Sequence, residues 1–380
     1  MIKLIQIIGA RPQIIKAAAI SRIIRAKYQS KIQDIIIHTG QHYDENMSQI
    51  FMHELDIPQE TYNLQIGSGT HGTQTARMIQ KIEEILLHEN PDAVLVYGDT
   101  NSTLAAAIAA VKIHIPVIHI EAGLRSFNKS MPEEINRIMC DHASTLLFAP
   151  TQTGFSNLKR EGFQYTETKP ISRDNPQMYY CGDIMYDNTL FYSSITDKKI
   201  DITQKYGVEK ESYFLATIHR PANTDSKENL SHICNEFKKL YTQTSYPVVL
   251  PLHPRTKSYL EKYDLLKEIE TAPGIIVTPP SSFLEMIALE KHARCIITDS
   301  GGVQKEAFFC KKPAIIVRPE TEWIEILQHN CAILSKPEDI SKHVIYMLTN
   351  PPQKYPHIFG DGKAAEFICE TIIEYIEKQS

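Results

Sequence analysis

Short apolar runs rich in isoleucine and valine recur along the whole chain, and each is followed by a turn and then by a helical pattern. This alternation is typical of parallel β-sheets whose strands are joined by crossover helices. The runs are almost continuously apolar, as strands covered on both faces must be. The sequence therefore predicts an α/β fold.

The runs form two comparable sets, one in each half of the 380-residue chain. Those of the first half lie at 4–8, 35–38, 93–97, 117–120 and 146–149, and those of the second at 213–218, 248–252, 275–278, 295–298 and 314–317. Two sets predict two Rossmann-like, doubly wound domains, and the length suits two domains. We place the hinge in the polar stretch 193–207, and an apolar stripe over 363–378 predicts a terminal helix.

Charge, hydropathy and cysteine content argue against nucleic acid, a membrane or structural zinc as a binding partner. Lys and Arg total 40 against 45 Asp and Glu, a net charge of −5, which gives no general attraction to nucleic acid or to an anionic membrane. No apolar run is long enough to cross a bilayer. The seven cysteines are scattered without a Cys-x-x-Cys pair, which indicates reduced thiols and no structural zinc. We expect a soluble cytoplasmic protein without a metal, in which any anion site is local.

In open α/β sheets ligands bind outside the carboxyl ends of the strands, and the residues there are polar in this chain. Arg11 and Lys16 bracket a helix start after the first run. The helix dipole disfavours cations at that end, so a bound anion would explain both.

Carboxylates follow two later runs of the first half. Asp99 and Glu121 come just after runs that we expect to be adjacent strands, and Glu133 and Glu134 lie in a loop-to-helix stretch after them. Three carboxylates could converge there and act in catalysis. The alternative is that Glu133 and Glu134 only complement a helix dipole.

The second half carries a candidate phosphate site. The turn at 299–302, Asp-Ser-Gly-Gly, precedes an expected helix at 303–309, so backbone N–H groups near Ser300, Gly301 and Gly302 could face a phosphate. The alternative is an ordinary strand-to-helix turn. Glu306 could accept hydrogen bonds from ribose hydroxyls, or it could simply be solvated. His219, at a strand end, could be functional, or it could be solvated or hydrogen-bonded within the core.

One further glycine pattern is a weaker signal. The string G-S-G-T-H-G at 67–72 matches G-x-G-x-x-G and precedes a helical pattern at 73–88. It does not open the first strand–helix–strand unit, as a dinucleotide site requires. We interpret it as a flexible loop.

Taken together, seven motifs in order over nearly the whole chain resemble those of the non-hydrolysing UDP-N-acetylglucosamine 2-epimerases. They are G-A-R-P-Q-I-I-K at 9–16, H-T-G-Q-H at 38–42, G-D-T at 98–100, E-A-G-L-R-S at 121–126, P-E-E-x-N-R at 132–137, H-R at 219–220 and D-S-G-G-V-Q-K-E-A at 299–307.

The resemblance implies a glycosyltransferase-B-like pair of domains with the active site in the cleft between them. It suggests an N-terminal domain over 1–192 that carries the catalytic carboxylates. The terminal helix, 363–380, would cross back and become part of this domain. A UDP-binding domain would cover 193–362.

It also implies site roles. Asp99, Glu121 and Glu133 match the family's active-site carboxylates, and His219 matches its histidine. Either Glu121 or Asp99 would transfer the proton, with Glu133 as partner. The other expected contacts are Arg11, Lys16, Arg137 and His219 around the diphosphate, and Ser300, Gly301, Gly302 and Glu306 at phosphate and ribose.

The implied reaction inverts carbon 2 of a UDP-acetamido sugar for surface polysaccharide precursors. Elimination of UDP would acidify the carbon 2 hydrogen and form a 2-acetamidoglucal, and UDP would then add back. No metal or nicotinamide cofactor is needed, because no hydride moves.

Departures from the common motifs bear on the sugar. Gln13 and Arg255 stand where glutamate and asparagine are usual, and both changes favour a more anionic ligand. The substrate is therefore either UDP-2,3-diacetamido-2,3-dideoxyglucuronate, which we prefer, or UDP-N-acetylglucosamine. The resemblance also implies an activating second UDP-sugar near Gln41 and His42, and a homodimer.

Two other function classes stay open. A UDP-sugar-dependent glycosyltransferase of the same fold would need an acceptor and has no use for three clustered carboxylates. A non-catalytic sugar-nucleotide sensor would dispense with the acids.

Overall fold

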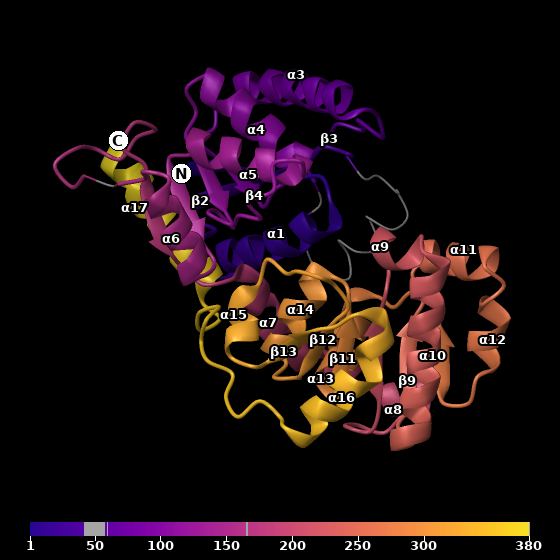
Figure 1. The fold of residues 1–380 in the computed structure, drawn as a ribbon. Coiled ribbons are helices and arrows are strands. Elements are labelled where there is room, and N and C mark those ends of the chain that lie inside the picture. The colour runs from indigo at the N-terminus through magenta and orange to yellow at the C-terminus, as the bar shows by residue number, and fades with distance from the viewer. Residues whose placement is uncertain (42–57, 59, 165, 380) are drawn as a thin grey trace. The chain divides into compact units, whose positions relative to one another are not determined.

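The computed structural model of the protein describes residues 1–41, 58, 60–164 and 166–379. The chain divides into two compact units, unit 1 comprising residues 1–188 and 357–380, and unit 2 comprising residues 189–356 (Figure 1). Each unit is an α/β unit built on one parallel sheet, which confirms the predicted fold class. The expected domain limits at 192/193 and 362/363 stay a prediction. No helix of the described residues is long and apolar enough to cross a membrane.

Unit 1 is built on a seven-stranded sheet in the order β3-β2-β1-β4-β5-β6-β7, with every pairing parallel. The strands are β1 (Ile2–Ile8), β2 (Ile32–His38), β3 (Tyr62–Asn63), β4 (Ala93–Tyr97), β5 (Val117–Ile120), β6 (Leu146–Ala149) and β7 (Gln177–Tyr180). The direction in which strands are added reverses between β1 and β4. Such a switch point leaves a crevice outside the carboxyl ends of the two strands.

Helices cover both faces of this sheet. They are α1 (Arg11–Ile23), a π-helical turn (Ile24–Tyr28), α3 (His71–Glu89), α4 (Asn101–Lys112), α5 (Pro132–Ala143), α6 (Gln152–Arg160), α7 (Ile184–Lys199), which runs on into unit 2, and α17 (Ala364–Gln379). Helices α3, α4 and α5 pack side by side, and their apolar side chains form one core cluster with those of β1, β2 and β4.

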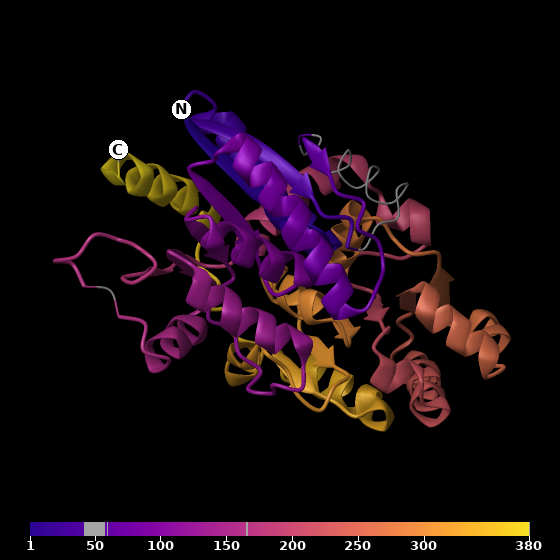
Figure 2. The same cartoon turned by 90° about the horizontal axis from the view of Figure 1, so that it is seen from above.

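The terminal helix α17 packs on α1. Its first turn is held by the carboxylate of Asp187, which accepts from the backbone N–H groups of Ala364 (3.2 Å) and Ala365 (2.8 Å). The N-terminus and the far end of α17 lie near each other in both views (Figures 1 and 2).

Unit 2 repeats the design with a six-stranded parallel sheet in the order β10-β9-β8-β11-β12-β13. The strands are β8 (Phe214–Thr217), β9 (Val248–Pro251), β10 (Ile275–Thr278), β11 (Cys295–Thr298), β12 (Ala314–Ile316) and β13 (Ala332–Leu334). Here the switch point lies between β8 and β11.

The helices of unit 2 lie between and after these strands. They are α8 (Ile202–Tyr206), α9 (Pro221–Thr224), α10 (Lys227–Thr244), α11 (Pro254–Lys262), α12 (Leu266–Thr271), α13 (Phe283–His292), α14 (Gly301–Phe309), α15 (Ile324–Gln328), a 3-10 turn (Pro337–Asp339) and α16 (Ile340–Thr349). Side chains of α10, α11, α12 and α16 form the core with one face of the sheet, and α13 packs against α14.

Three strands were not predicted from the sequence. They are β3, β7 and β13, each at the edge of its sheet. An edge strand is paired on one side only and needs less apolar surface. These three are short and most of their residues are only partly buried, so their apolar signal is weak.

Candidate active site

The side chain of Gln13 ties together the two turns at the switch point of unit 1. Its amide oxygen accepts from the backbone N–H groups of Gly9 (2.9 Å) and Ala10 (3.2 Å), and its amide nitrogen donates to the carbonyl of Tyr97 (2.8 Å). A glutamate could not make that last bond, because an ionised carboxylate only accepts. Gln13 is buried and its polar atoms hold the backbone. The expectation that it tunes the site for an anionic sugar is therefore not supported.

Lys16 and Glu121 form an ion pair at the same switch point. Glu121 follows β5 and has a backbone φ of +74°. Gly98, directly after β4, also has a positive φ of +62°. A β-carbon on Gly98 would lie 3.0 Å from the Glu121 carboxylate and 3.4 Å from the Lys16 ammonium. Glycine is thus needed here both for its conformation and for the close approach of this ion pair.

Asp99, the next residue, pairs with the guanidinium of Arg137 on α5. Burial raises the pKa of Asp99, and the carboxylates Glu121 and Glu133 add to this rise, while Arg137 and Lys16 oppose it. The Asp99 side chain still keeps 35 % of its exposure, so it can reach a ligand. The three carboxylates that were predicted to converge, Asp99, Glu121 and Glu133, lie near enough for Glu121 and Glu133 to act on Asp99.

Glu133 and Glu134 have separate roles at the start of α5. Glu134 is buried, and its carboxylate accepts from the backbone N–H groups of Ser126 and Phe127, each at 2.9 Å, and pairs with Arg137 at 2.8 Å. These bonds outweigh burial and lower its pKa. Glu133 is exposed and faces a cavity. Glu134 is therefore structural, and Glu133 remains available to a ligand.

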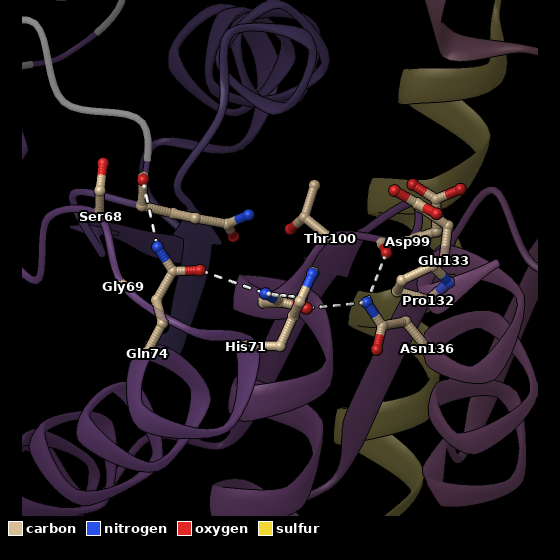
Figure 3. Close-up of a pocket in the computed structure, with 11 residues that line it drawn as sticks. Ser68, Gly69, His71, Gln74, Asp99, Thr100, Pro132, Glu133 and Asn136 are labelled. Atoms are coloured by element: carbon tan, nitrogen blue, oxygen red, sulfur yellow. Dashed lines mark hydrogen bonds between the residues drawn. The ribbon is translucent and has the colours of Figure 1, made fainter. Parts of the chain in front are cut away.

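The cavity, of about 370 Å³, opens beside these residues (Figure 3). Figure 3 shows the carboxyl groups of Asp99 and Glu133 at the same end of it. The residues that line it are Gln41, Ser68, Gly69, His71, Gln74, Asp99, Thr100, Asn101, Pro132, Glu133 and Asn136. The glycine-rich string at 67–72, which we had interpreted as a flexible loop, thus supplies part of the wall. The one feature of the sequence that could have indicated this role is the position of the string directly before a helical pattern.

Gln41 and His42 were expected at an activator site. Gln41 lines the cavity, but its amide oxygen already accepts from the backbone N–H (2.9 Å) and the hydroxyl (2.7 Å) of Ser102. His42 lies outside the described residues.

At the switch point of unit 2, Asp299 joins the ends of β11 and β8. Its buried carboxylate accepts from the backbone N–H groups of His219 (3.0 Å) and Arg220 (2.9 Å) and from the Asn223 amide (2.9 Å). The His219 side chain is 36 % exposed, with Nδ1 at 3.4 Å from Asp299. This places an accessible imidazole beside a fixed carboxylate.

Helix α14 begins at Gly301, two residues after Asp299. A β-carbon on Gly301 would lie 2.9 Å from a carboxylate oxygen of Glu322, and one on Gly302 would lie 3.9 Å from the Ser300 hydroxyl and 4.0 Å from the Glu306 carboxylate. Glycine at position 301 therefore leaves room for the Glu322 carboxylate, while the Ser300 N–H donates to the Thr298 hydroxyl (2.9 Å) and Glu306 lies one turn away. A helix start of this kind can bind phosphate.

Arg11 and Arg255 differ in what surrounds them. Arg11 is the first, exposed residue of α1. Arg255, in the first turn of α11, donates to both carboxylate oxygens of Asp225 at 2.6 Å and to the Thr224 hydroxyl at 3.1 Å. A ligand carboxylate would have to compete with Asp225 for it.

Metal-ligating side chains do not gather in the part of the chain that the structure describes: no group of three or more His, Cys, Asp or Glu residues there could hold an ion. All seven cysteines are unpaired.

Comparison with known proteins gives a consistent result. A family model described as UDP-N-acetylglucosamine 2-epimerase matches residues 25–373. A Methanococcus maripaludis protein named UDP-N-acetylglucosamine 2-epimerase homolog is 46% identical over 374 residues, covering 97% of this chain and 99% of its own.

Two further matches differ in the sugar that they name. The UDP-2,3-diacetamido-2,3-dideoxy-D-glucuronate 2-epimerase of Pseudomonas aeruginosa is 43% identical, over 97% of this chain and 99% of its own. The crystal structure of the Methanocaldococcus jannaschii UDP-GlcNAc 2-epimerase in complex with UDP-GlcNAc and UDP superposes with a TM-score of 0.84 at 41% identity, covering 98% of this chain and 100% of that one.

Proposed function

The chain belongs to the UDP-N-acetylglucosamine 2-epimerase family, and from this premise we propose that it is an isomerase that inverts carbon 2 of a UDP-activated 2-acetamido sugar. The observation that carries the proposal is the cluster of Asp99, Glu121 and Glu133 with Lys16 and Arg137 at one switch point. We assign the phosphate site to the start of α14, at the switch point of the second unit.

The reaction needs elimination, because the carbon 2 hydrogen is not α to a carbonyl and is too weakly acidic for a carboxylate. As the bond from carbon 1 to the UDP oxygen breaks, its electron pair leaves with UDP. A carboxylate takes the carbon 2 proton, and the C–H electrons form the double bond of a 2-acetamidoglucal. Protonation on the opposite face and return of UDP to carbon 1 give the epimer.

The unit 1 carboxylates divide this work according to their surroundings. Glu121 is held beside the Lys16 ammonium, which favours the ionised form that can accept a proton. Burial raises the pKa of Asp99, and we assign to it the return of the proton on the opposite face. Glu133, exposed at the cavity, stabilises positive charge that develops at carbon 1.

Unit 2 holds the leaving group in this proposal. The N–H groups at the start of α14, near Ser300, Gly301 and Gly302, bind the diphosphate, and Glu306 accepts from the ribose hydroxyls. His219 donates to the diphosphate and offsets its charge as it leaves. Arg11, Lys16 and Arg137 add positive charge from unit 1.

Two sugars are candidates for the substrate. The relatives name two sugars at similar identity, and Gln13 is engaged with the backbone. Our preference for UDP-2,3-diacetamido-2,3-dideoxyglucuronate over UDP-N-acetylglucosamine therefore rests on Arg255, which would have to exchange Asp225 for the sugar carboxylate.

We further propose a cytoplasmic homodimer. Seven unpaired thiols suit a reducing compartment. The exposed apolar side chains Ile135 and Met139, one turn apart on α5, support self-association. The activating second UDP-sugar near Gln41 also stays a proposal. Light scattering and the dependence of rate on UDP-sugar concentration test these two points.

Incubation with a UDP-sugar alone tests the main proposal. An epimerase forms the carbon 2 epimer until equilibrium, which proton NMR detects. A glycosyltransferase leaves the sugar nucleotide unchanged without an acceptor, and a sensor binds it without turnover. Absence of an epimer from both candidate sugars would contradict the proposal.

A further inference from the structure

His119 and Asp141 form a buried pair directly beneath the switch point of unit 1. His119 lies in β5 and Asp141 in α5, and both side chains have no exposed surface. Nδ1 of His119 is 2.7 Å from Oδ1 of Asp141, and Nε2 is 2.8 Å from the carbonyl oxygen of Gly98. Neither residue was singled out by the sequence analysis.

The partners determine where the protons are. The Gly98 carbonyl can only accept, so Nε2 of His119 carries a hydrogen. The other oxygen of Asp141 accepts from the Gly123 backbone N–H (3.1 Å) and pairs with Arg125 (2.7 Å). The Arg125 guanidinium and the Gly123 N–H both favour the ionised form of Asp141, so the proton between Asp141 and His119 belongs to the nitrogen. His119 is then an imidazolium.

The electrostatic surroundings agree with this assignment. Burial alone would lower the pKa of His119, but its neighbours Cys140 and Asp141 outweigh that effect and raise it well above the ordinary value. For Asp141, burial is outweighed by His119 and Arg125, and the pKa is lowered. Arg125 is itself paired with Glu161, which completes the set of charges around the pair.

The pair holds the main chain just before Asp99 and just after Glu121. Gly98 immediately precedes Asp99, and its N–H donates to the Ile120 carbonyl at 3.0 Å while its C=O accepts from His119. Gly123, held by Asp141, follows Glu121 by two residues. Glu121 itself has a φ of +74°, a conformation that is strained for a residue other than glycine and persists only where the surrounding structure holds it.

We propose that His119 is a positioning residue, held as an imidazolium, which with Asp141 fixes the backbone that presents Asp99 and Glu121 to the substrate. This inference rests on the proposed function, because only there are Asp99 and Glu121 given a catalytic role. The charge state and the backbone contact can be measured without turnover.

The charge state is tested in the wild-type protein. Nitrogen-15 NMR of histidine-labelled protein at pH 7 is expected to show both ring nitrogens of His119 protonated, with no change up to pH 8. An unprotonated ring nitrogen assigned to His119 would overturn the imidazolium assignment. This measurement needs no substitution and does not depend on the reaction.

The positioning role is tested with His119→Gln. Glutamine can keep the bond to Gly98 or the bond to Asp141 but not both, because both partners accept and the amide has only one donor nitrogen. The carbon-13 titration of the Asp99 carboxyl is expected to shift. The kcat is expected to fall about tenfold or more while KM changes less than about threefold. Asp141→Asn serves for the same comparison if His119→Gln does not fold. The control is His88→Gln, at a side chain that is 79 % exposed on α3.

The outcomes separate the two levels of the argument. A folded His119→Gln with an unchanged Asp99 titration and unchanged kcat would overturn the positioning role. A loss of thermal stability with an unchanged Asp99 titration would also overturn it, because His119 would then be structural only. If the wild type epimerises no UDP-sugar, the proposed function fails, but the nitrogen spectrum and the Asp99 titration still decide this inference.

Discussion

Lys16 and Glu121 form an ion pair at the switch point of unit 1, where the order in which strands are added to the sheet reverses. The lysine comes from the helix after β1 and the glutamate from the turn after β5, and Gly98 after β4 leaves the space in which they meet. Three chain segments are thus needed to place one carboxylate. This explains why the site can be sensitive to a residue that contacts no substrate.

Gly98→Ala should depress turnover through this ion pair. The new β-carbon would lie 3.0 Å from the Glu121 carboxylate and would sit at a φ of +62°, which costs an L-residue about 1 to 2 kcal/mol. We expect a lower kcat and a lower melting temperature. Gly162→Ala is the matched control, since Gly162 also has a positive φ but has open space around it. It should lose stability only, and equal kcat losses in the two variants would contradict the argument.

Removal of each site carboxylate should slow the chemical step and leave nucleotide binding intact. For Asp99→Asn, Glu121→Gln and Glu133→Gln we expect kcat to fall about 10²-fold or more, or about 2.7 kcal/mol. Glu306→Ala should do the reverse, with weaker UDP binding and a milder loss of rate. Steady-state kinetics and calorimetric titration with UDP measure both.

Glu84→Gln, on the exposed side of α3, is the control for these carboxylate variants and should match the wild type. Near wild-type rates in all three carboxylate variants would show that the active site lies elsewhere.

Asp187 should make the protein less stable as the pH rises from about 4 to about 6. Burial raises the pKa of this carboxyl from 3.8 to about 6, so in that window the folded state binds more protons than the unfolded state and stability falls with pH. One pKa unit corresponds to about 1.4 kcal/mol, so the full effect is about 2 to 3 kcal/mol.

Asp187→Asn removes this titration. We compare the free energies of unfolding of the variant and the wild type, measured in urea at pH 4 and pH 7. Relative to the wild type, the variant should be more stable at pH 7 than at pH 4 by that amount. A constant difference would rule out the raised pKa.

Arg255→Asn should change sugar selectivity if Arg255 leaves Asp225 to bind a sugar carboxylate. We expect the ratio of kcat/KM for UDP-2,3-diacetamido-2,3-dideoxyglucuronate to that for UDP-N-acetylglucosamine to fall about tenfold or more. Asp225→Asn, which frees the arginine, should raise it. An unchanged ratio in both variants would remove the structural basis for preferring the uronate.

The central strands and the residues that follow them could be predicted, because a strand buried on both faces needs a continuous apolar run and its carboxyl end is where ligands bind. Runs such as 93–97, 117–120 and 295–298 coincide with β4, β5 and β11. The edge strands β3, β7 and β13 could not, since partial exposure leaves little apolar signal.

The supporting contacts of the site could not be predicted either, because they depend on distant partners. Gln13 bonds to Tyr97, 84 residues away, and His119 pairs with Asp141 on another element. The wall formed at 67–72 follows β3, a two-residue edge strand whose weak apolar signal does not mark the segment as part of a site. Arg255 was expected to face the ligand, and nothing in its own sequence neighbourhood identified Asp225 as its partner.

The most direct test of the account is proton NMR of the UDP-sugar product formed in deuterated water. Elimination gives the carbon 2 proton to a side chain before the opposite face is protonated, so the epimer should carry deuterium at carbon 2 and the recovered substrate should acquire it as turnover proceeds. An epimer that keeps its original hydrogen at carbon 2 through many turnovers would contradict the elimination mechanism and the roles assigned to Asp99 and Glu121.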